Sequence, residues 1–200
     1  MVETAAAPTT AERILDASVE AFGSRGFGST SLDELARELG IRKQTILYWF
    51  PSKDALLAAA LDACAAILAT ELEAALVAAP DGWPRVQALL RKAFRVAARR
   101  PALLGLLREA DRLGAPSSGR LVERLAPLVT RAKAWLAVEM AAGRLRQHDP
   151  DAVLLAAYSM LTGLATEVET QRALGMATDL RALVRRERAL EQFLRAALVP

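Results

Sequence analysis

The sequence is poor in the residues on which most catalytic and metal sites depend. Its 200 residues include one cysteine and one histidine. A single cysteine excludes an intrachain disulfide framework and any Cys-x-x-Cys site, and a single histidine argues against a histidine-rich metal centre. The sequence also shows no glycine-rich phosphate loop and no Ser–His–Asp candidate. We therefore predict no catalytic residue, no metal and no cofactor.

Breakers, aromatics and β-branched residues are also scarce. There are 11 glycines and 9 prolines, which excludes collagen-like and linker-dominated architectures, and aromatic residues make up 5% of the chain. Hydrophobic residues reach 53% and charged residues 24%, a balance typical of globular proteins. Alanine and leucine dominate. This composition predicts an all-α fold of one or two domains.

Targeting and membrane signals are missing from the sequence. The first eight residues contain no basic segment followed by an apolar run, so they do not resemble a secretory signal. The longest notable uncharged stretch, Ala152–Thr166, is shorter than the roughly 20 residues that a bilayer span requires. We expect a cytoplasmic protein with no membrane contact, in which Cys64 is reduced.

Net charge is a weak guide to the partners of this chain. The formal net charge is +3, but the first 60 residues carry six basic and eight acidic side chains. The other residues carry 20 basic and 15 acidic side chains. A nucleic-acid function therefore cannot rest on bulk charge and needs a specific constellation of residues.

Periodicity and breakers divide the chain into about nine expected helices. Near the N-terminus we expect a helix from Thr9 or Thr10, a short one from Ser31 to Gly40, and a third over about Lys43–Trp49. Ser52 should cap a long fourth helix. Near the C-terminus we expect one helix from Pro150 to about Gly175 and another from Asp179 to about Leu198.

The informative segment is residues 32–49, which fits a helix-turn-helix. Such a motif needs a small residue where two helices touch and a residue tolerant of positive φ in the turn, and Ala36 and Gly40 meet these needs. Five apolar residues fall where the corner must be plugged: Leu35, Leu39, Ile41, Ile46 and Trp49. We expect Trp49 to pack in the core. The alternative is an ordinary helical corner with solvated basic residues.

The second helix of this pair would present its N-terminal side chains to a DNA major groove. The candidate DNA-contacting residues on it are Arg42, Lys43, Gln44, Thr45 and Tyr48. Lysine or arginine reads guanine and glutamine reads adenine. No acidic residue occurs from Leu39 to Lys53. Thr30 and Ser31, at the start of the preceding helix, are candidate phosphate contacts.

The stretch from Thr10 to Leu61 resembles the N-terminal domain of TetR-type transcriptional regulators. The matching segments are Ile14–Ala17, Phe22, Arg25–Phe27, Thr30–Leu32, Glu34–Ala36, Leu39–Ile41 and Phe50–Leu56. The resemblance implies a homodimer that binds a palindromic operator in double-stranded DNA, usually as a repressor released by a small ligand. It also implies DNA contacts by Lys43, Gln44, Thr45 and Lys53. Leu47 departs from the family's usual phosphate-binding tyrosine.

From this we expect a DNA-binding domain over residues 1–54 and a ligand-binding and dimerisation domain over residues 55–200. Two apolar stripes near the C-terminus predict a four-helix dimer interface. The stripes comprise Val153, Ala157, Leu161, Ala165 and Val168, then Leu183, Leu190, Phe193 and Leu194. The alternative is that both stripes complete an intrachain core.

An alanine-rich bundle can leave a cavity, and such cavities are mostly apolar. The candidate ligand-binding residues are Trp83, Phe94, Leu104, Leu107, Trp135, Met140 and Tyr158. Their chemistry predicts a largely apolar small-molecule effector, although a residue of this kind, taken singly, more often belongs to the core than to a pocket.

Three functions stay open at this point. The first is a ligand-responsive repressor, the second is an activator or ligand-independent regulator, and the third is a helical enzyme or apolar-ligand carrier.

Overall fold

The computed structural model describes residues 7–166 and 168–200, with the side chains of 164–166 and 168–170 left out of the description. Within this part of the chain all regular structure is helical, as predicted. The helices are α1 (Thr10–Arg25), α2 (Leu32–Leu39), α3 (Lys43–Trp49), α4 (Lys53–Ala78), α5 (Trp83–Arg99), α6 (Pro101–Leu113), α7 (Ser117–Ala141), α8 (Pro150–Thr166), α9 (Val168–Ala173) and α10 (Leu180–Leu198).

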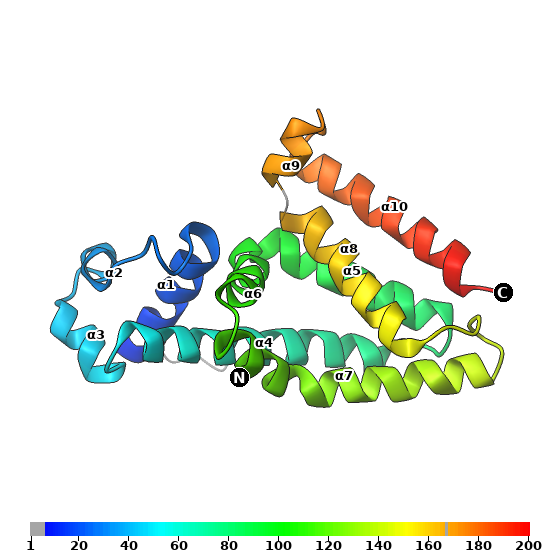
Figure 1. Ribbon diagram of the computed structural model, residues 1–200, viewed down its shortest axis with the longest axis horizontal. Helices are drawn as coiled ribbons and strands as arrows, with labels where there is room; N and C mark the ends of the chain where they lie inside the picture. The colour runs from blue at the N-terminus through cyan, green and yellow to red at the C-terminus, as the bar shows by residue number, and fades with distance from the viewer. Residues whose placement is uncertain (1–6, 167) are drawn as a thin grey trace, which may run out of the picture.

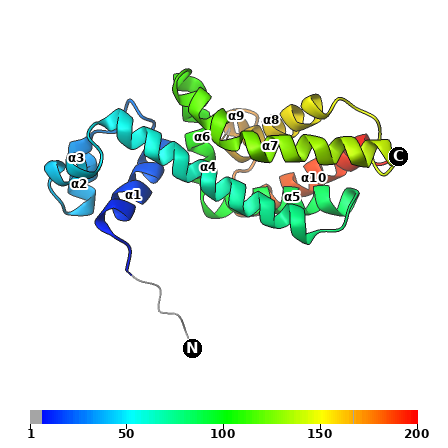
Figure 2. The same cartoon turned by 90° about the horizontal axis from the view of Figure 1, so that it is seen from below.

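The molecule is elongated, with its two ends built from different parts of the chain. Helices α1–α3 form one end, and α4 runs from that end along the molecule beside α7 (Figures 1 and 2). Helices α5, α8 and α10 fill the other end, where the C-terminus lies. Helix α6 lies between the two ends and packs most extensively against α1.

Local capping explains where the first helices begin. The Thr9 hydroxyl accepts from the Glu12 backbone N–H while the Glu12 carboxylate accepts from the Thr9 N–H, which is a capping box. Ser31 and Glu34 form a second capping box at α2. Ser52 caps α4 through the Ala55 N–H. The predicted starts of these helices are confirmed.

One expected boundary, the start of α7, was wrong. The helix expected from Pro150 to near Gly175 covers α8 and α9, and residue 167 between them lies outside the described residues. The Gly163 carbonyl, in the last turn of α8, accepts from the Gln171 side chain of α9 at 3.2 Å. The sequence of Ala115–Gly119 predicts a loop and a helix that starts near Arg120, but α7 begins at Ser117, since the Arg120 N–H already donates to the Pro116 carbonyl at 3.0 Å.

The molecule has two hydrophobic cores, one toward each end of its long axis. The first joins α1–α4 to α6, with Phe22, Leu35, Ile46 and Leu103 fully buried. The second joins α5, α7, α8 and α10. The end built by α1–α3 is therefore not a separate globule, because its core continues into α6.

Helix α4 is the one described helix that is long and apolar enough to cross a membrane by length and composition alone. Its apolar side chains pack against other helices of the chain, and Leu56, Leu57, Leu61 and Leu68 are buried there. It packs against α1, α5, α6 and α7. This packing is that of the core helix of a folded domain.

Candidate DNA-binding surface and ligand cavity

The corner between α2 and α3 has the geometry that the sequence predicts. Gly40 ends α2 in the left-handed conformation with φ 67°, and the Ile41 N–H donates to the Ala36 carbonyl at 2.9 Å. Ala36 is buried where α2 meets its neighbours. Leu35 and Ile46 fill the corner with no exposed surface. A side chain larger than alanine at position 36 would force the two helices apart.

Helix α3 leaves most of its candidate DNA-reading side chains on the surface. Arg42, Gln44 and Tyr48 are exposed, and Lys43 and Thr45 are half-buried. Arg42 is the N-cap residue and makes no side-chain cap hydrogen bond, so its guanidinium extends freely from the start of the helix. The first turn contains no acidic residue. This end of α3 therefore presents donors, positive charge and the helix dipole to solvent.

Two cations of the predicted surface are held by neighbours that the sequence did not reveal. Lys43 Nζ lies 2.7 Å from Asp33 Oδ2 of α2. Lys53 Nζ lies 4.2 Å from the centroid of the Phe27 ring, a cation–π geometry. Both pairs fix the direction of an otherwise flexible side chain. Asp33 and Phe27 thus belong to the site although neither reads DNA.

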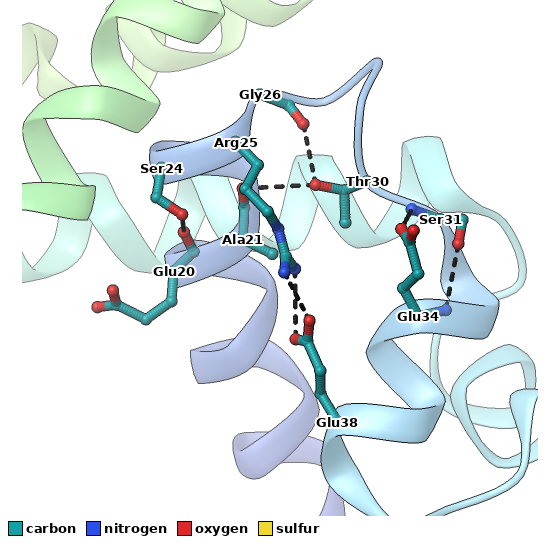
Figure 3. A network of polar contacts seen from close by, with 9 residues as sticks. All are labelled: Glu20, Ala21, Ser24, Arg25, Gly26, Thr30, Ser31, Glu34 and Glu38. Atoms are coloured by element: carbon teal, nitrogen blue, oxygen red, sulfur yellow. Dashed lines mark hydrogen bonds and ion pairs between the residues drawn. The ribbon is translucent and has the colours of Figure 1, made fainter.

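The loop between α1 and α2 corrects the prediction for Thr30. This residue is 1% exposed, and its hydroxyl faces the carbonyls of Ala21 and Gly26 at 3.4 and 2.9 Å (Figure 3). It therefore holds the loop and is not available to a phosphate. Ser31 is exposed, and its hydroxyl oxygen accepts from the Glu34 N–H at 3.1 Å, which leaves its proton free for a phosphate oxygen.

Trp49 does not pack in the core as expected. It is 47% exposed and stands edge-to-face against Tyr48, which is 80% exposed, with ring centroids 5.3 Å apart. Ile46 is the only buried residue of α3, because Trp49 lies in the last turn of α3, before the chain turns at Phe50. Leu47, at the family's tyrosine position, is also exposed. The aromatic pair therefore supplies the surface at this end of α3.

A cavity of about 300 Å³ lies among the helices that follow α3. Its wall is almost entirely aliphatic and comes from α4, α5, α6, α7, α8 and α10. Val129 of α7 and Tyr158 of α8 line it and are also exposed, so the cavity reaches the surface between these helices.

The predicted ligand-binding residues divide into two groups. Leu104, Leu107, Trp135 and Tyr158 line the cavity. Trp83, Phe94 and Met140 lie outside this lining, in and against the second core. Helix periodicity could not separate the two groups, because a core side chain and a wall side chain show the same apolar spacing.

The hydroxyl groups on the wall are already hydrogen-bonded, whereas the buried indole N–H of Trp135, also on the wall, makes no hydrogen bond to the described residues. The Tyr158 hydroxyl donates a hydrogen bond to Asp111 Oδ2 at 3.0 Å, and the Thr162 hydroxyl donates one to the Tyr158 carbonyl at 2.8 Å. Burial and the adjacent Asp111 carboxylate raise the pKa of Tyr158 to about 12, so the phenol stays protonated. The wall therefore carries no charge at neutral pH and favours uncharged apolar molecules.

The predicted dimer stripes mostly face their own chain. Val153, Ala157 and Leu161 line the cavity, and Leu190 and Leu194 are buried in the second core. Val153, Ala157 and Leu161 are half-exposed, so their contact with a partner chain stays a prediction, whereas burial within their own chain corrects the expectation for Leu190 and Leu194. Leu183 is half-buried and Phe193 is 61% exposed. The side chains of Ala165 and Val168 lie outside the described residues.

The apolar side chains that α8 and α10 do expose are different ones. Leu155 is 66% exposed, Leu180 67% and Val184 40%. Phe193 is 61% exposed as well, on the side of α10 opposite Val184, because the two residues are nine apart in one helix. We call Leu155 and Phe193 the exposed α8–α10 face.

The described residues offer little to catalytic or metal chemistry. Among them no group of three or more His, Cys, Asp or Glu side chains could hold a metal ion. Cys64 is fully buried and its thiol donates to the Leu103 carbonyl at 3.5 Å. Burial raises the pKa of Cys64 to about 12, so it is a small core residue, as expected.

Comparison with known proteins agrees with this geometry. Residues 14–60 match the family model described as bacterial regulatory proteins, tetR family. The regulator RutR of Escherichia coli K12 is 44% identical over 48 residues, which are 24% of this chain and 23% of RutR. The alignment thus spans about a quarter of the length of that relative.

Solved structures resemble the chain over nearly its full length, at low sequence identity. A transcriptional regulator from Saccharomonospora viridis in complex with choline has a TM-score of 0.78 and 19% identity, covering 95% of this chain and 97% of that one. AibR, solved with isovaleryl coenzyme A and operator DNA, has a TM-score of 0.69 and 17% identity, covering 78% and 85%. At these identities the likeness shows the fold alone.

Proposed function

The N-terminal domain of this chain is a TetR-family DNA-binding domain, and from this premise we propose that the chain is a ligand-responsive transcriptional repressor. In this proposal it binds a palindromic operator as a homodimer, in the cytoplasm and without a membrane, and a small apolar effector releases it. Residues 1–54 act as the DNA-binding domain and residues 55–200 as the ligand-binding and dimerisation domain.

The observation that carries the proposal is the exposed, acid-free start of α3 on a capped and tightly packed corner. Lys43 and Gln44 would read base edges, because an ammonium donates to O6 and N7 of guanine, and a carboxamide donates to N7 of adenine and accepts from its N6 amine. Arg42, Thr45 and Tyr48 would add contacts from the same helix. Ser31 and Lys53 would position the domain on the phosphates without reading sequence.

Homodimerisation is proposed through the exposed α8–α10 face. Leu155 and Phe193 are large apolar side chains at 66% and 61% exposure, which a monomer in water would leave wetted. Two-fold symmetry repeats one patch on both subunits and places two copies of α3 at a fixed separation. A palindromic operator matches that symmetry.

The proposed effector is an uncharged, mainly apolar molecule small enough for a cavity of about 300 Å³. The wall offers aliphatic side chains, and its hydroxyls are already bonded within the chain. The similar structures contain choline and isovaleryl coenzyme A, which differ in charge. The effector class proposed here therefore rests on the walls of this cavity and not on those relatives.

The experiment is selection from a pool of randomised duplex DNA with the purified protein at a stated salt concentration. Enrichment of one palindrome, with two chains per duplex by light scattering, is expected. Enrichment of no sequence by a folded dimer would overturn the regulator proposal.

The dimer is tested separately by charge insertion. Phe193→Glu should yield monomers and weaken operator binding. Val122→Glu is the matched control, because Val122 is 67% exposed and belongs to α7, which contributes no residue to that face. Equal dimerisation of the two variants would contradict the proposed interface.

A further inference from the structure

Helix α6 presents two functional faces to two different parts of the molecule. Leu104 and Leu107 line the cavity, and Asp111 accepts a hydrogen bond from the hydroxyl of the cavity residue Tyr158. On the opposite face, Gly105 meets α1, and Glu109 meets the loop that follows α1. Residues three, four and seven apart share a helix face, so both sets are regular stripes of one helix. A displacement at one stripe is therefore carried to the other.

The contact of α6 with α1 is made by backbone. A Cβ atom on Gly105 would lie 2.0 Å from the Gly23 carbonyl oxygen, and one on Gly23 would lie 2.0 Å from the Ala102 carbonyl oxygen. The two helices therefore touch with no side chain between them, an approach that glycine alone permits. We call this backbone contact the seam. It has no layer of flexible side chains that could absorb a displacement, so α1 moves when α6 moves.

Glu109 extends this seam to the loop between α1 and α2. Its carboxylate is buried at 7% exposure, and Oε1 accepts the backbone N–H of Phe27 at 2.6 Å. Arg112 donates two hydrogen bonds to the same carboxylate, each at 2.7 Å. The Arg112 hydrogen bonds, together with the Phe27 N–H, hold the pKa of Glu109 below its usual range, so it is charged at neutral pH.

The loop that Glu109 holds leads directly to the proposed DNA contacts. The Phe27 ring stacks edge-to-face on the buried Phe22 and carries Lys53 Nζ on its face at 4.2 Å. Three residues further on, Thr30 secures the loop and Ser31 caps α2 (Figure 3). The position of the Phe27 backbone therefore sets where Lys53 and the start of α2 lie.

We propose that Glu109 is a positioning residue that couples the ligand cavity to the DNA-facing loop through α6. The inference rests on the proposed function and names the residue through which its regulation acts. When the cavity is filled, Leu104 and Leu107 displace α6, and the Glu109 carboxylate carries the Phe27 N–H with it. Lys53 and Ser31 then leave the positions that fit the operator phosphates.

The chain contains a twin of this arrangement that serves as the matched control. Glu139 of α7 is 1% exposed, takes two hydrogen bonds of 2.7 Å from Arg144, and has its pKa lowered by Arg144 and the Gly82 backbone. It lies at the end of α7, remote from α1–α3. Glu109→Leu and Glu139→Leu remove the same buried charge, but Glu109→Leu alone frees the DNA-facing loop.

The first test compares these variants by the backbone amide of Phe27 in the full-length protein. Glu109→Leu should accelerate hydrogen exchange at this amide and weaken binding to the selected duplex by about tenfold, within the usual range of coupling between sites. Glu109→Gln keeps an acceptor oxygen and should restore both readouts. Glu139→Leu should change neither. Equal Phe27 exchange in the two leucine variants would overturn the assignment.

The second test fills the cavity without an identified effector. Ala157→Phe on α8 places a ring among the lining residues. It should shift the Phe27 amide resonance in the Glu109 and Glu109→Gln backgrounds, and by at most about a third as much in Glu109→Leu, because the coupling is a property of the pair. An unmoved Phe27 resonance, or equal shifts in all backgrounds, would overturn the relay. This readout needs no DNA, so failure to select an operator would count against the proposed function alone.

Discussion

Apolar side chains fill the interior at one end of this molecule and leave a cavity at the other. Around α1–α3 the side chains of Ile14, Phe22, Leu35 and Ile46 fill the interior with at most 1% exposure. Around α5, α7, α8 and α10 the leucines stand back from one another and leave about 300 Å³ open. A surface that reads DNA needs fixed geometry, whereas an effector needs an open and mostly apolar cavity.

The difference between the ends assigns different roles to mutations of one chemical type. A change that alters volume in the filled end disturbs the reading geometry, and the same change beside the cavity is absorbed or mimics a ligand. The seam between α1 and α6 is where the two behaviours meet. Substitutions at the seam, on the reading surface and beside the cavity should therefore differ in size of effect, in that order.

The seam itself should be the most sensitive place. Gly105→Ala puts a Cβ atom 2.0 Å from the Gly23 carbonyl oxygen, so one helix must move. We expect the free energy of unfolding to fall by about 3 kcal/mol, the upper range for overpacking, in chemical denaturation. Gly119→Ala on α7, where no described atom lies within 4 Å, should be neutral or stabilising by up to about 1 kcal/mol. Equal stabilities would show that the helices do not touch at Gly105.

The reading surface should lose specificity before stability. Lys43→Ala and Gln44→Ala should each relax base preference at one operator position per half-site, removing about 1–3 kcal/mol of discrimination. The measurement is a repeat of the duplex selection with each variant, beside thermal unfolding. If both variants and the natural protein selected identical sequences, α3 would not be the recognition helix.

Much of the reading surface follows from the sequence, and the reason is that its determinants are local. Ser31, Gly40 and Ser52 act within four residues of themselves, so capping and turn rules place α2, α3 and α4 correctly. The prediction for Trp49 was wrong because Leu35 and Ile46 fill the corner without it, which depends on packing and not on spacing.

The rest depends on contacts between distant residues. Glu109 and Phe27 are 82 positions apart, and no spacing rule connects them. The apolar stripe of α8 was expected at a dimer interface, since periodicity shows that a face is buried but not whether a cavity, a core or a partner buries it. The boundary predicted at residue 54 lies inside the continuous helix α4, where no sequence signal marks a change of domain.

Phosphate contacts should show a smaller, sequence-independent effect. Lys53→Ala should weaken binding to all duplexes alike and reduce the slope of log K against log salt by about 1 for each phosphate that is no longer neutralised. Lys133→Ala removes the same charge from α7, where Lys133 pairs with Asp151, and should leave the slope unchanged. The measurement is a salt series of anisotropy titrations. A slope reduced equally by both substitutions would mean that net charge matters and position does not.

The smallest effect is expected from an ion-pair cluster that joins α4 to α7. Arg120 and then Arg124 hold the pKa of Asp62 below its usual value through hydrogen bonds of 2.6–2.9 Å. Because the folded pKa lies below the unfolded one, this stabilisation is present above the unfolded value of about 4 and is lost as pH falls through the folded pKa.

Asp62→Asn should therefore lower the free energy of unfolding at pH 7 by about 1 kcal/mol, since the pair is partly exposed. The two proteins should converge as the pH falls below the pKa of Asp62 in the folded protein. A difference that persists unchanged in acid would assign the effect to packing and not to charge.

The most direct measurement is the affinity for the selected operator in the presence of three ligands of one chain length. Decanol, decanoate and decyltrimethylammonium share an apolar tail and differ in the charge of the head group. The uncharged, aliphatic wall of the cavity predicts that decanol alone weakens operator binding, by at least about fivefold, the lower end of coupling between sites. Release by a charged compound alone, or by none of the three, would contradict the link between this cavity and DNA reading.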